Sequence, residues 1–551
     1  MYCFVIIHTK ETAGLEQSGG SHLNSNSKKI TGAAVIVMTS LVVSRITGYL
    51  RTILINNLLT AHQSDALLAA FRTTDLMYNM LIGGAISAAL IPILSGYLAK
   101  DEEEKGWKAV GSFINVVFLT MAVVSFLGVI FAPQIIQLTA QGLQGTVRED
   151  AIYLTRILFP SVGFMMLAGM TNGVLNSYKR FAAAAYGPSI YNLGTALSIF
   201  ALSRFGVKYV AYGVLASAVV YFIIQISFAL PNFKFYRPKI YLKDEGFIRL
   251  FKLAIPSLGA SAVAQINIVI SLTFTSSFSQ GSITAYNCAN EVWQLPYGIF
   301  AMGLGTALLP TLSEKLSLNN TSEFKDIMLK GFRTILYLII PSAVALLVIP
   351  QPVISVVYKW GSNVDAERII MAASILMLFT VAIVGQSMLA LLNRAFYASN
   401  DTKTPLYVGA GSIFLNFILC NIFVFKTGLG PAGMSLAYSI QSVVNMLVMM
   451  YLLSRKMKGM QWKSLTFYGL RLLAAASVMG VVVFLMNKWI AIDFTRGFTL
   501  SLKLSEIGAM VTVVAVGCLV YFGFTMLFKV PEAVSFKNKY FGRFLKKRLT
   551  K

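Results

Sequence analysis

The sequence predicts an all-α polytopic membrane protein with about 14 transmembrane helices, arranged as two six-helix lobes followed by two further helices. Three observations predict this fold: the apolar composition, the spacing of the apolar runs and an internal repeat. Of the 551 residues, 56% are hydrophobic and only 12% are charged, and the mean hydropathy is +0.70. Because a soluble protein of this length needs a larger polar surface, the composition excludes a soluble globule.

The apolar runs have the length of membrane spans. A helix needs roughly 20 apolar residues to cross the hydrocarbon core, and several runs exceed that length, which indicates tilt or extension beyond the bilayer. The predicted spans are 31–57, 66–98, 109–132, 151–175, 183–203, 208–230, 247–278, 283–313, 327–349, 368–393, 405–425, 431–454, 465–487 and 504–528.

The segment before the first span, residues 1–30, is mostly polar. It lacks a basic stretch followed by an apolar core of roughly 7–15 residues, the pattern of a cleavable signal peptide. We therefore expect a polar N-terminal tail. The four cysteines lie far apart, at positions 3, 288, 420 and 518, and their spacing predicts neither a disulfide framework nor a zinc site.

The chain also repeats itself. Three short motifs recur in the same order at an offset of 217 or 218 residues, which indicates a duplication. The pairs are Leu90–Ser95 with Leu308–Ser313, Pro133-Gln134 with Pro350-Gln351, and Leu175-Asn176 with Leu392-Asn393. Each half holds six spans, so both halves begin on the same side of the membrane. The repeat is therefore parallel, and substrate sites in such folds lie between the halves.

The repeat divides the chain into five predicted parts. The polar tail (1–30) precedes an N-terminal lobe (31–245) and a C-terminal lobe (246–460), and the last two spans (461–530) lie outside the duplicated core. A basic tail (531–551) follows them.

The basic residues predict the orientation. The net charge of +24 comes from short clusters between apolar runs, as in the cytoplasmic loops of membrane proteins, and it does not indicate nucleic-acid binding. Every second loop is rich in Lys and Arg, whereas residues 58–65 and 279–282 contain neither. We therefore expect both chain termini to be cytoplasmic. The basic loops and tail hold Lys100, Lys105, Lys108, Lys179, Arg180, Lys234, Arg237, Lys239, Lys243, Lys315, Lys325, Arg455, Lys456, Lys458, Lys463 and six Lys or Arg residues within 537–548.

Motifs of soluble enzymes do not occur. The sequence contains no GxxxxGK[ST], HExxH, GxSxG or CxxC pattern. We therefore expect no catalytic residue, no metal and no cofactor, and a transporter that does not itself hydrolyse nucleotide.

Charged residues inside the apolar spans are the candidate site. Such a charge costs about 2.5–3.5 kcal/mol at the bilayer centre, so it normally faces a cavity or a partner. Five residues fit this description: Arg45, Arg51, Arg72, Asp75 and Glu291. Arginine suits phosphate because its planar fork makes two parallel charge-assisted hydrogen bonds. Snorkelling to an interface, or pairing of Arg72 with Asp75, remains the alternative explanation.

Several motifs occur in order along the chain: Ser44–Arg51 (Ser-Arg-Ile-Thr-Gly-Tyr-Leu-Arg), Ser64-Asp65-Ala66, Phe71, Asn176, Arg180-Phe181, Gly303–Thr306 with Pro310, Phe396-Tyr397 and Asp401–Pro405. Together they resemble the MurJ/MviN family of lipid II flippases, over residues of about 28–530. The resemblance implies two six-helix lobes around a cationic cavity, a lipid-tail groove formed by spans 13 and 14, and alternating access. It also implies that Arg45, Arg51 and Asp65 belong to the site.

The chain departs from the family pattern at a few positions. Tyr78, Asn79 and Gly83 stand where the family has two arginines and a glutamate, and Asn290-Glu291 stands where it has Asp-Arg. The cavity is therefore less cationic than in those relatives. The repeat places Glu291 opposite Thr73, which is next to Arg72, so we expect Glu291 to pair with Arg72, or otherwise with Arg45 or Arg51.

The resemblance implies a flippase that moves lipid II, an undecaprenyl-pyrophosphate-linked peptidoglycan precursor, from the inner to the outer leaflet of the bacterial inner membrane. Its partners would be lipid II or a similar polyprenyl-linked sugar and membrane lipids, with other wall-synthesis proteins left open. Three alternatives remain: an exporter of another oligosaccharide-lipid, a drug/cation antiporter of the same superfamily, and a non-transporting scaffold. The antiporter would need acidic cavity residues, such as Asp75 and Glu291, rather than arginines.

Overall fold

The computed structural model describes residues 21–85, 89–361, 364–399, 401–490 and 498–537. The regular structure of these ranges consists entirely of helices. Ten helical segments among them are long and apolar enough to cross a membrane. The protein is an all-α polytopic membrane protein, which confirms the predicted fold class.

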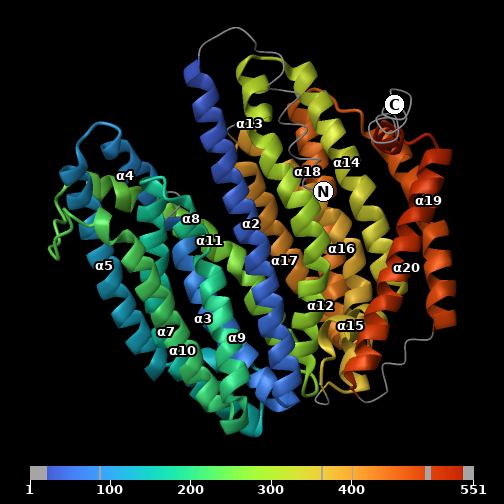
Figure 1. Ribbon diagram of the computed structural model, residues 1–551, viewed down its shortest axis with the longest axis horizontal. Coiled ribbons are helices and arrows are strands. Elements are labelled where there is room, and N and C mark those ends of the chain that lie inside the picture. Colours follow the sequence, from blue (N-terminus) through green and yellow to red (C-terminus); the bar gives the residue numbers. More distant parts are fainter. Residues whose placement is uncertain (1–20, 86–88, 362–363, 400, 491–497, 538–551) are drawn as a thin grey trace, which may run out of the picture.

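The first half of the chain forms one lobe, seen in blue to green in Figure 1. Its first helix begins ten residues earlier than the predicted span, within the segment expected to be a polar tail; residues 1–20 lie outside the described ranges. The helices are α2 (Ser21–Leu58), α3 (Ala61–Ala85), α4 (Ile91–Leu98), α5 (Glu103–Ile130), α6 (Ala132–Thr139), α7 (Gly145–Ser177), α8 (Phe181–Ala185), α9 (Gly187–Leu202) and α10 (Val207–Ala229).

The second half repeats this order of elements. Helices α5 and α14 both have 28 residues, and α7 and α16 both have 33. The helices are α11 (Glu245–Thr275), α12 (Ser282–Pro296), the π-helical turn η4 (Tyr297–Met302), α13 (Gly303–Ser317), α14 (Thr321–Val348), α15 (Pro350–Tyr358), α16 (Ala366–Ala398), α17 (Lys403–Phe425) and α18 (Ala432–Lys456).

Three predicted spans are not single regular helices, and one of them, 183–203, is divided at Tyr186 into α8 and α9. The predicted span 66–98 contains α3 and α4, and residues 86–88 lie outside the described ranges. Pro92 lies in the first turn of α4, where its missing amide costs little. The predicted span 283–313 contains the turn η4 directly after Pro296. Widening a helix to π geometry after a proline is a common way to accommodate the lost hydrogen bond.

Short helices α6 and α15 follow α5 and α14 in the two halves, and they were not predicted. Each begins beside a proline, Pro133 in α6 and Pro350 in α15. With eight and nine residues, they are too short to appear as spans, since a span needs roughly 20 residues.

One long helix organises each lobe. Helix α7 packs against α3, α5 and α10, and α16 packs against α12, α14 and α18. Each of these helices is buried along most of its length, so their apolar residues form the lobe cores.

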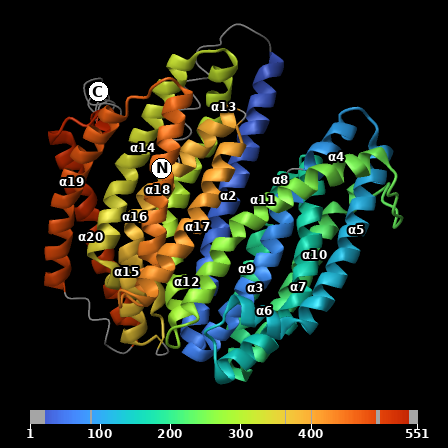
Figure 2. The ribbon, with the colours of Figure 1, turned by 180° about the vertical axis from the view of Figure 1, so that it is seen from behind.

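Helices α2 and α11 lie between the lobes (Figures 1 and 2). Although α11 begins the second half of the repeat, it packs mainly against α3 and α5 of the first half. We call the end of the molecule where α4 and α13 terminate the basic end, because Lys100, Lys239 and Lys458 lie in its loops. The other end, where α12 begins, is called the opposite end.

Two further helices, α19 (Trp462–Ile490) and α20 (Leu500–Leu527), flank the C-terminal lobe. Helix α19 packs against α14, and its buried residues Leu465, Leu472 and Met479 belong to the core of that lobe. Helix α20 packs against α19 and touches α15. Although α19 lies outside the repeat, it therefore contributes to the hydrophobic core of the second lobe.

Candidate functional site

Glu291 occupies the centre of a hydrogen-bonded cluster between the lobes. Its carboxylate accepts from Thr52 Oγ1 of α2 (2.9 Å), from Asn287 Nδ2 of its own helix (3.1 Å) and from the Tyr358 hydroxyl at the end of α15 (3.1 Å). The Tyr49 hydroxyl of α2 donates to the main-chain carbonyl of Glu291 (2.6 Å). The cluster therefore joins the first helix of one lobe to two helices of the other.

Asn287 connects Glu291 with Arg72. The Arg72 guanidinium of α3 donates to Asn287 Oδ1, while the same amide donates to Glu291. The expected direct ion pair between Glu291 and Arg72 is therefore wrong for this conformation. The reason is helical geometry: Asn287 lies one turn before Glu291 on the same face of α12, so its amide stands between the two charged groups.

Arg51 and Asp75 lie deeper in the N-terminal lobe. Arg51 donates to Asn192 Oδ1 of α9 (3.3 Å), and its guanidinium carbon lies 5.5 Å from the centre of the Phe71 ring. Asp75 is half-buried. It lies close enough to Arg51 and Arg72 to interact electrostatically with both. The three predicted residues therefore form one electrostatic group.

Arg45 extends from α2 toward the π-helical turn. Its side chain is exposed, and its Nη2 atom lies 3.8 Å from the position that a Cβ atom on Gly298 would take. Arg394 of α16 approaches the same region, where it lies next to Gly305. Tyr297 of η4 is within electrostatic reach of both arginines. Arginines of the two lobes thus meet beside η4.

Asp65 has a different setting from the other predicted site residues. It is 3% exposed, and its carboxylate accepts from the Gly281 amide (2.6 Å), the Thr284 amide (3.0 Å) and the Thr284 hydroxyl (2.7 Å). It therefore caps the N-terminus of α12, where the helix dipole favours an anion. Arg368 of α16 lies within electrostatic reach of this carboxylate. Asp65 joins the lobes rather than facing an open site.

More hydrogen bonds join the lobes near Asp65. Asn57 at the end of α2 donates to the Tyr358 carbonyl (2.7 Å) and accepts from the Trp360 amide (2.7 Å). The Thr273 hydroxyl of α11 donates to the Thr139 carbonyl (3.0 Å). We call the contacts of Asp65, Asn57 and Thr273 the seam. The seam closes the opposite end of the space between the lobes.

Sequence reasoning missed the neutral members of the cluster and Arg394. Thr52, Asn287 and Tyr358 carry no charge, so a charge within a span does not mark them. Arg394 lies directly after the predicted span 368–393 and is therefore outside the set of charges within spans. Their positions within one turn of Arg51 and Glu291 could have indicated Thr52 and Asn287, but no sequence signal connects Tyr358 with Glu291.

The family-like motif Asp401–Pro405 lies away from this cluster, at the basic end. Asp401 accepts from Lys456 Nζ (2.8 Å) and from the Thr404 amide (3.0 Å) and hydroxyl (2.9 Å). The hydrogen bond from Lys456 lowers the pKa of Asp401 to about 2. Because the pKa of Asp401 is lower in the folded protein than in the unfolded chain, the ionised carboxylate stabilises the fold at any pH above the pKa of the unfolded chain. This stabilisation is lost as the pH falls through about 2. The motif therefore ties the loop before α17 to the end of α18.

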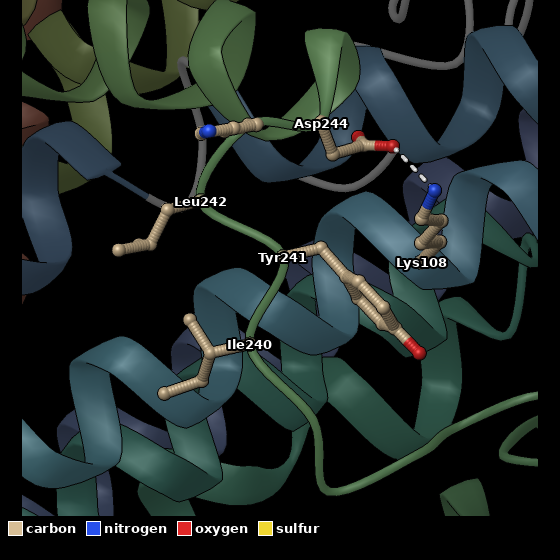
Figure 3. A pocket seen from close by; sticks show the side chains of 6 residues that line it. Lys108, Ile240, Tyr241, Leu242 and Asp244 are labelled. Carbon is tan, nitrogen blue, oxygen red and sulfur yellow. Dashed lines mark ion pairs between the residues drawn. The ribbon is translucent and has the colours of Figure 1, made fainter.

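A surface hollow of about 390 Å³ lies at the basic end of the N-terminal lobe (Figure 3). Lys108 and Asp244 form an ion pair across it, at 3.6 Å, and Asp244 caps α11 by accepting from the Phe247 amide. The hollow contains none of the predicted site residues. Within the described ranges, no group of three or more His, Cys, Asp or Glu side chains could hold a metal ion.

Comparisons with known proteins point to one family. The family model described as "Lipid II flippase MurJ" matches residues 55–505. The Lipid II flippase MurJ of Burkholderia cenocepacia is 28% identical over 517 residues, which cover 91% of this chain and 96% of that protein. The Probable lipid II flippase MurJ of Rhizobium tropici is 29% identical over 494 residues, covering 85% and 89%.

Solved structures agree with this similarity. A structure titled "Lipid II flippase MurJ, inward closed conformation" is 25% identical, with a TM-score of 0.75 over 90% of this chain and 98% of that chain. An inward-facing multidrug resistance MATE transporter of the MOP superfamily has a TM-score of 0.65 at 15% identity, over 77% and 98%. Because the MATE transporter is only 15% identical to this chain, its similarity shows the fold alone.

Proposed function

Because this chain belongs to the MurJ family of lipid II flippases, we propose that it moves lipid II from the inner to the outer leaflet of the bacterial inner membrane by alternating access. It is a transporter and not an enzyme, as are its relatives. The observation that carries the proposal is that Arg45 of α2 and Arg394 of α16 approach the same turn, η4, from the two lobes. Arg72 of α3 also reaches across to Asn287 of α12. Their cations suit the pyrophosphate group of lipid II.

The experiment that tests this function follows lipid II itself. Cells depleted of the protein are expected to accumulate lipid II on the inner leaflet, where an externally added enzyme that cleaves lipid II cannot reach it. Re-expression of the wild-type chain should restore cleavage. If lipid II remains accessible from outside after depletion, the proposal is wrong.

We place the termini and the basic end in the cytoplasm. Under this orientation the seam lies on the outer side, so the described conformation is closed to the outside. A cysteine at Lys239, in the loop before α11, is expected to react with a membrane-impermeant maleimide only after cells are opened. A cysteine at exposed Phe205, at the opposite end of α9, serves as the matched control and should react in intact cells. Labelling of position 239 in intact cells would reverse the topology.

In this proposal the two lobes comprise residues 31–245 and 246–460, and the polyprenyl tail stays in lipid along α19 and α20, within 461–530. The outer faces of these helices support this placement, because Phe467, Val481, Leu504 and Val511 are exposed and suit an apolar chain.

The membrane potential can supply the driving force. Moving one charge through 100 mV is worth about 2.3 kcal/mol, and with the inside negative the export of a di-anion is downhill. If cavity arginines neutralise the pyrophosphate, the membrane potential instead drives the step in which the empty, positively charged site turns back to the inside. Neither route requires ATP.

The bridge formed by Asn287 offers a direct test of the cluster. Removing it with Asn287→Leu is expected to lower the transport rate roughly tenfold or more, since both Arg72 and Glu291 lose a hydrogen bond in a buried setting, at about 1–3 kcal/mol each. The control is Asn290→Leu, because Asn290 accepts from Trp293 on its own helix. Equal rates for the two variants would exclude a special role of the bridge. The rate is measured with reconstituted protein and fluorescent lipid II.

A further inference from the structure

The last membrane helix begins with a buried ion pair that the proposed function does not use. Lys503 is 2% exposed, and its Nζ atom lies 3.2 Å from Glu506 Oε2. The same ammonium donates to the Ser355 carbonyl of α15 at 2.7 Å and lies 5.4 Å from the centre of the Trp360 ring. Intramembrane charges are normally retained for a partner or a function. Here the cation of α20 is directed at the carboxyl end of α15.

The carboxyl end of α15 is where three parts of the protein meet. Helix C-termini carry partial negative charge, so a lysine there is stabilising. The Ser355 carbonyl accepts from the Lys359 amide (2.9 Å) as well as from Lys503. Less than one turn after Ser355, the Tyr358 hydroxyl donates to Glu291 (3.1 Å) and to the Cys288 carbonyl (3.4 Å). The next backbone groups, the Tyr358 carbonyl and the Trp360 amide, bind Asn57 of the other lobe.

These contacts form a short continuous path. Ser355 and Tyr358 belong to one helix of nine residues, which moves as a unit because its backbone is hydrogen-bonded throughout. A shift of α15 at Ser355 therefore displaces the groups that hold Asn57. The rest of α20 is attached elsewhere, for example by the Tyr521 hydroxyl, which donates to the Tyr337 carbonyl (2.9 Å).

We propose that Lys503 is a positioning residue that holds the carboxyl end of α15 where Tyr358 and Trp360 can bind Asn57, and that it thereby favours closure of the seam. When Lys503 of α20 is docked on α15, closure of the seam is favoured, and closure of the seam in turn favours this docking. If the polyprenyl tail lies along α19 and α20, as the proposed function has it, tail occupancy acts on the seam through Lys503. Only this last step rests on the proposed function.

The native thiol of Cys288 reports on the seam. Cys288 is 3% exposed and its Sγ atom lies 3.5 Å from Asn56 Oδ1 of α2, so separation of the lobes at this end exposes it. In a protein whose other cysteines are replaced by alanine, the variant Lys503→Met/Glu506→Leu removes both buried charges and avoids an unpaired carboxylate. Maleimide labelling of Cys288 in detergent-purified protein is expected to accelerate roughly fivefold or more.

Three variants complete the test. Asn57→Ala, which breaks the seam directly, should accelerate labelling and should add little to the effect of the Lys503→Met/Glu506→Leu variant, because both act on one arrangement. Tyr521→Phe removes a different hydrogen bond of α20, and Asp401→Asn/Lys456→Met removes the ion pair at the basic end; both should leave the rate unchanged.

Unchanged labelling in the folded Lys503→Met/Glu506→Leu variant, alongside faster labelling in Asn57→Ala, would overturn the proposal. Equal acceleration by Tyr521→Phe would do the same, since docking of α20 in general would then suffice. If the Lys503→Met/Glu506→Leu variant does not fold, Lys503→Arg takes its place, because arginine keeps the charge but not the geometry. Lys503→Arg is expected to accelerate labelling to a smaller extent. A wild-type labelling rate in Lys503→Arg would then contradict the positioning role of Lys503. None of these measurements uses lipid II, so they stand if the proposed substrate is wrong.

Discussion

The variant Arg51→Glu is expected to abolish lipid II transport while the protein remains inserted and folded. At about 6 Å and an effective dielectric constant of about 20, one charge pair is worth about 3 kcal/mol. Reversal turns that attraction for the pyrophosphate into repulsion, a change of roughly 6 kcal/mol or about 10⁴-fold in affinity. The measurement is lipid II transport by purified variants in vesicles, with membrane insertion checked separately.

A graded series makes this prediction specific. We expect transport to fall in the order wild type, Arg51→Lys, Arg51→Gln and Arg51→Glu, because lysine keeps the charge but not the bidentate fork. The matched control is Arg204→Glu, an exposed arginine that stacks on Phe205 at the end of α9; its transport should be unchanged.

The neighbouring carboxylate allows a second distinction. If Arg51 serves only to balance Asp75, the charge-swapped variant Arg51→Glu/Asp75→Arg should recover transport. Our proposal expects no recovery, since the phosphate-binding cation would be displaced from α2 to α3. Recovery to wild-type rates would remove Arg51 from the substrate site.

The variant Asp65→Ala is expected to lower stability and to stop transport through a different cause. It leaves the Gly281 and Thr284 donors and the nearby Arg368 without their anion in a buried position. Removing one partner from such a site costs about 3–5 kcal/mol. The opposite end should then fail to close, so the transport cycle stalls. Thermal unfolding in detergent and faster maleimide labelling of Cys288 provide the two measurements.

A second N-cap aspartate provides the control. Asp244 also accepts from a helix amide, that of Phe247, but it lies at the basic end, and its removal is expected to cost about 1 kcal/mol without loss of transport. Asp65→Asn, which keeps an acceptor but not the charge, should fall between wild type and Asp65→Ala. If Asp65→Ala retains wild-type stability and labelling, the carboxylate does not hold the seam.

The sequence by itself determined the membrane character, the all-α fold and five of the charges within the spans. These properties depend on local composition and on apolar run length, which follow from the thickness of the bilayer. The sequence did not predict the π-helical turn within the span 283–313, because Pro296 permits a kink but does not decide whether such a turn forms. The short helices α6 and α15 were missed because they do not cross the membrane.

Only the tertiary structure decided which groups meet. Arg72, Asn287 and Glu291 lie on two helices more than 200 positions apart in the chain, and the partner of a buried charge depends on distances of a few ångströms that no local pattern contains. The same holds for Asp65, which the sequence grouped with the site residues and which the structure places on the N-terminus of α12. A carboxylate binds whichever donors the fold brings to it, arginine or helix amide, and helix packing makes that choice.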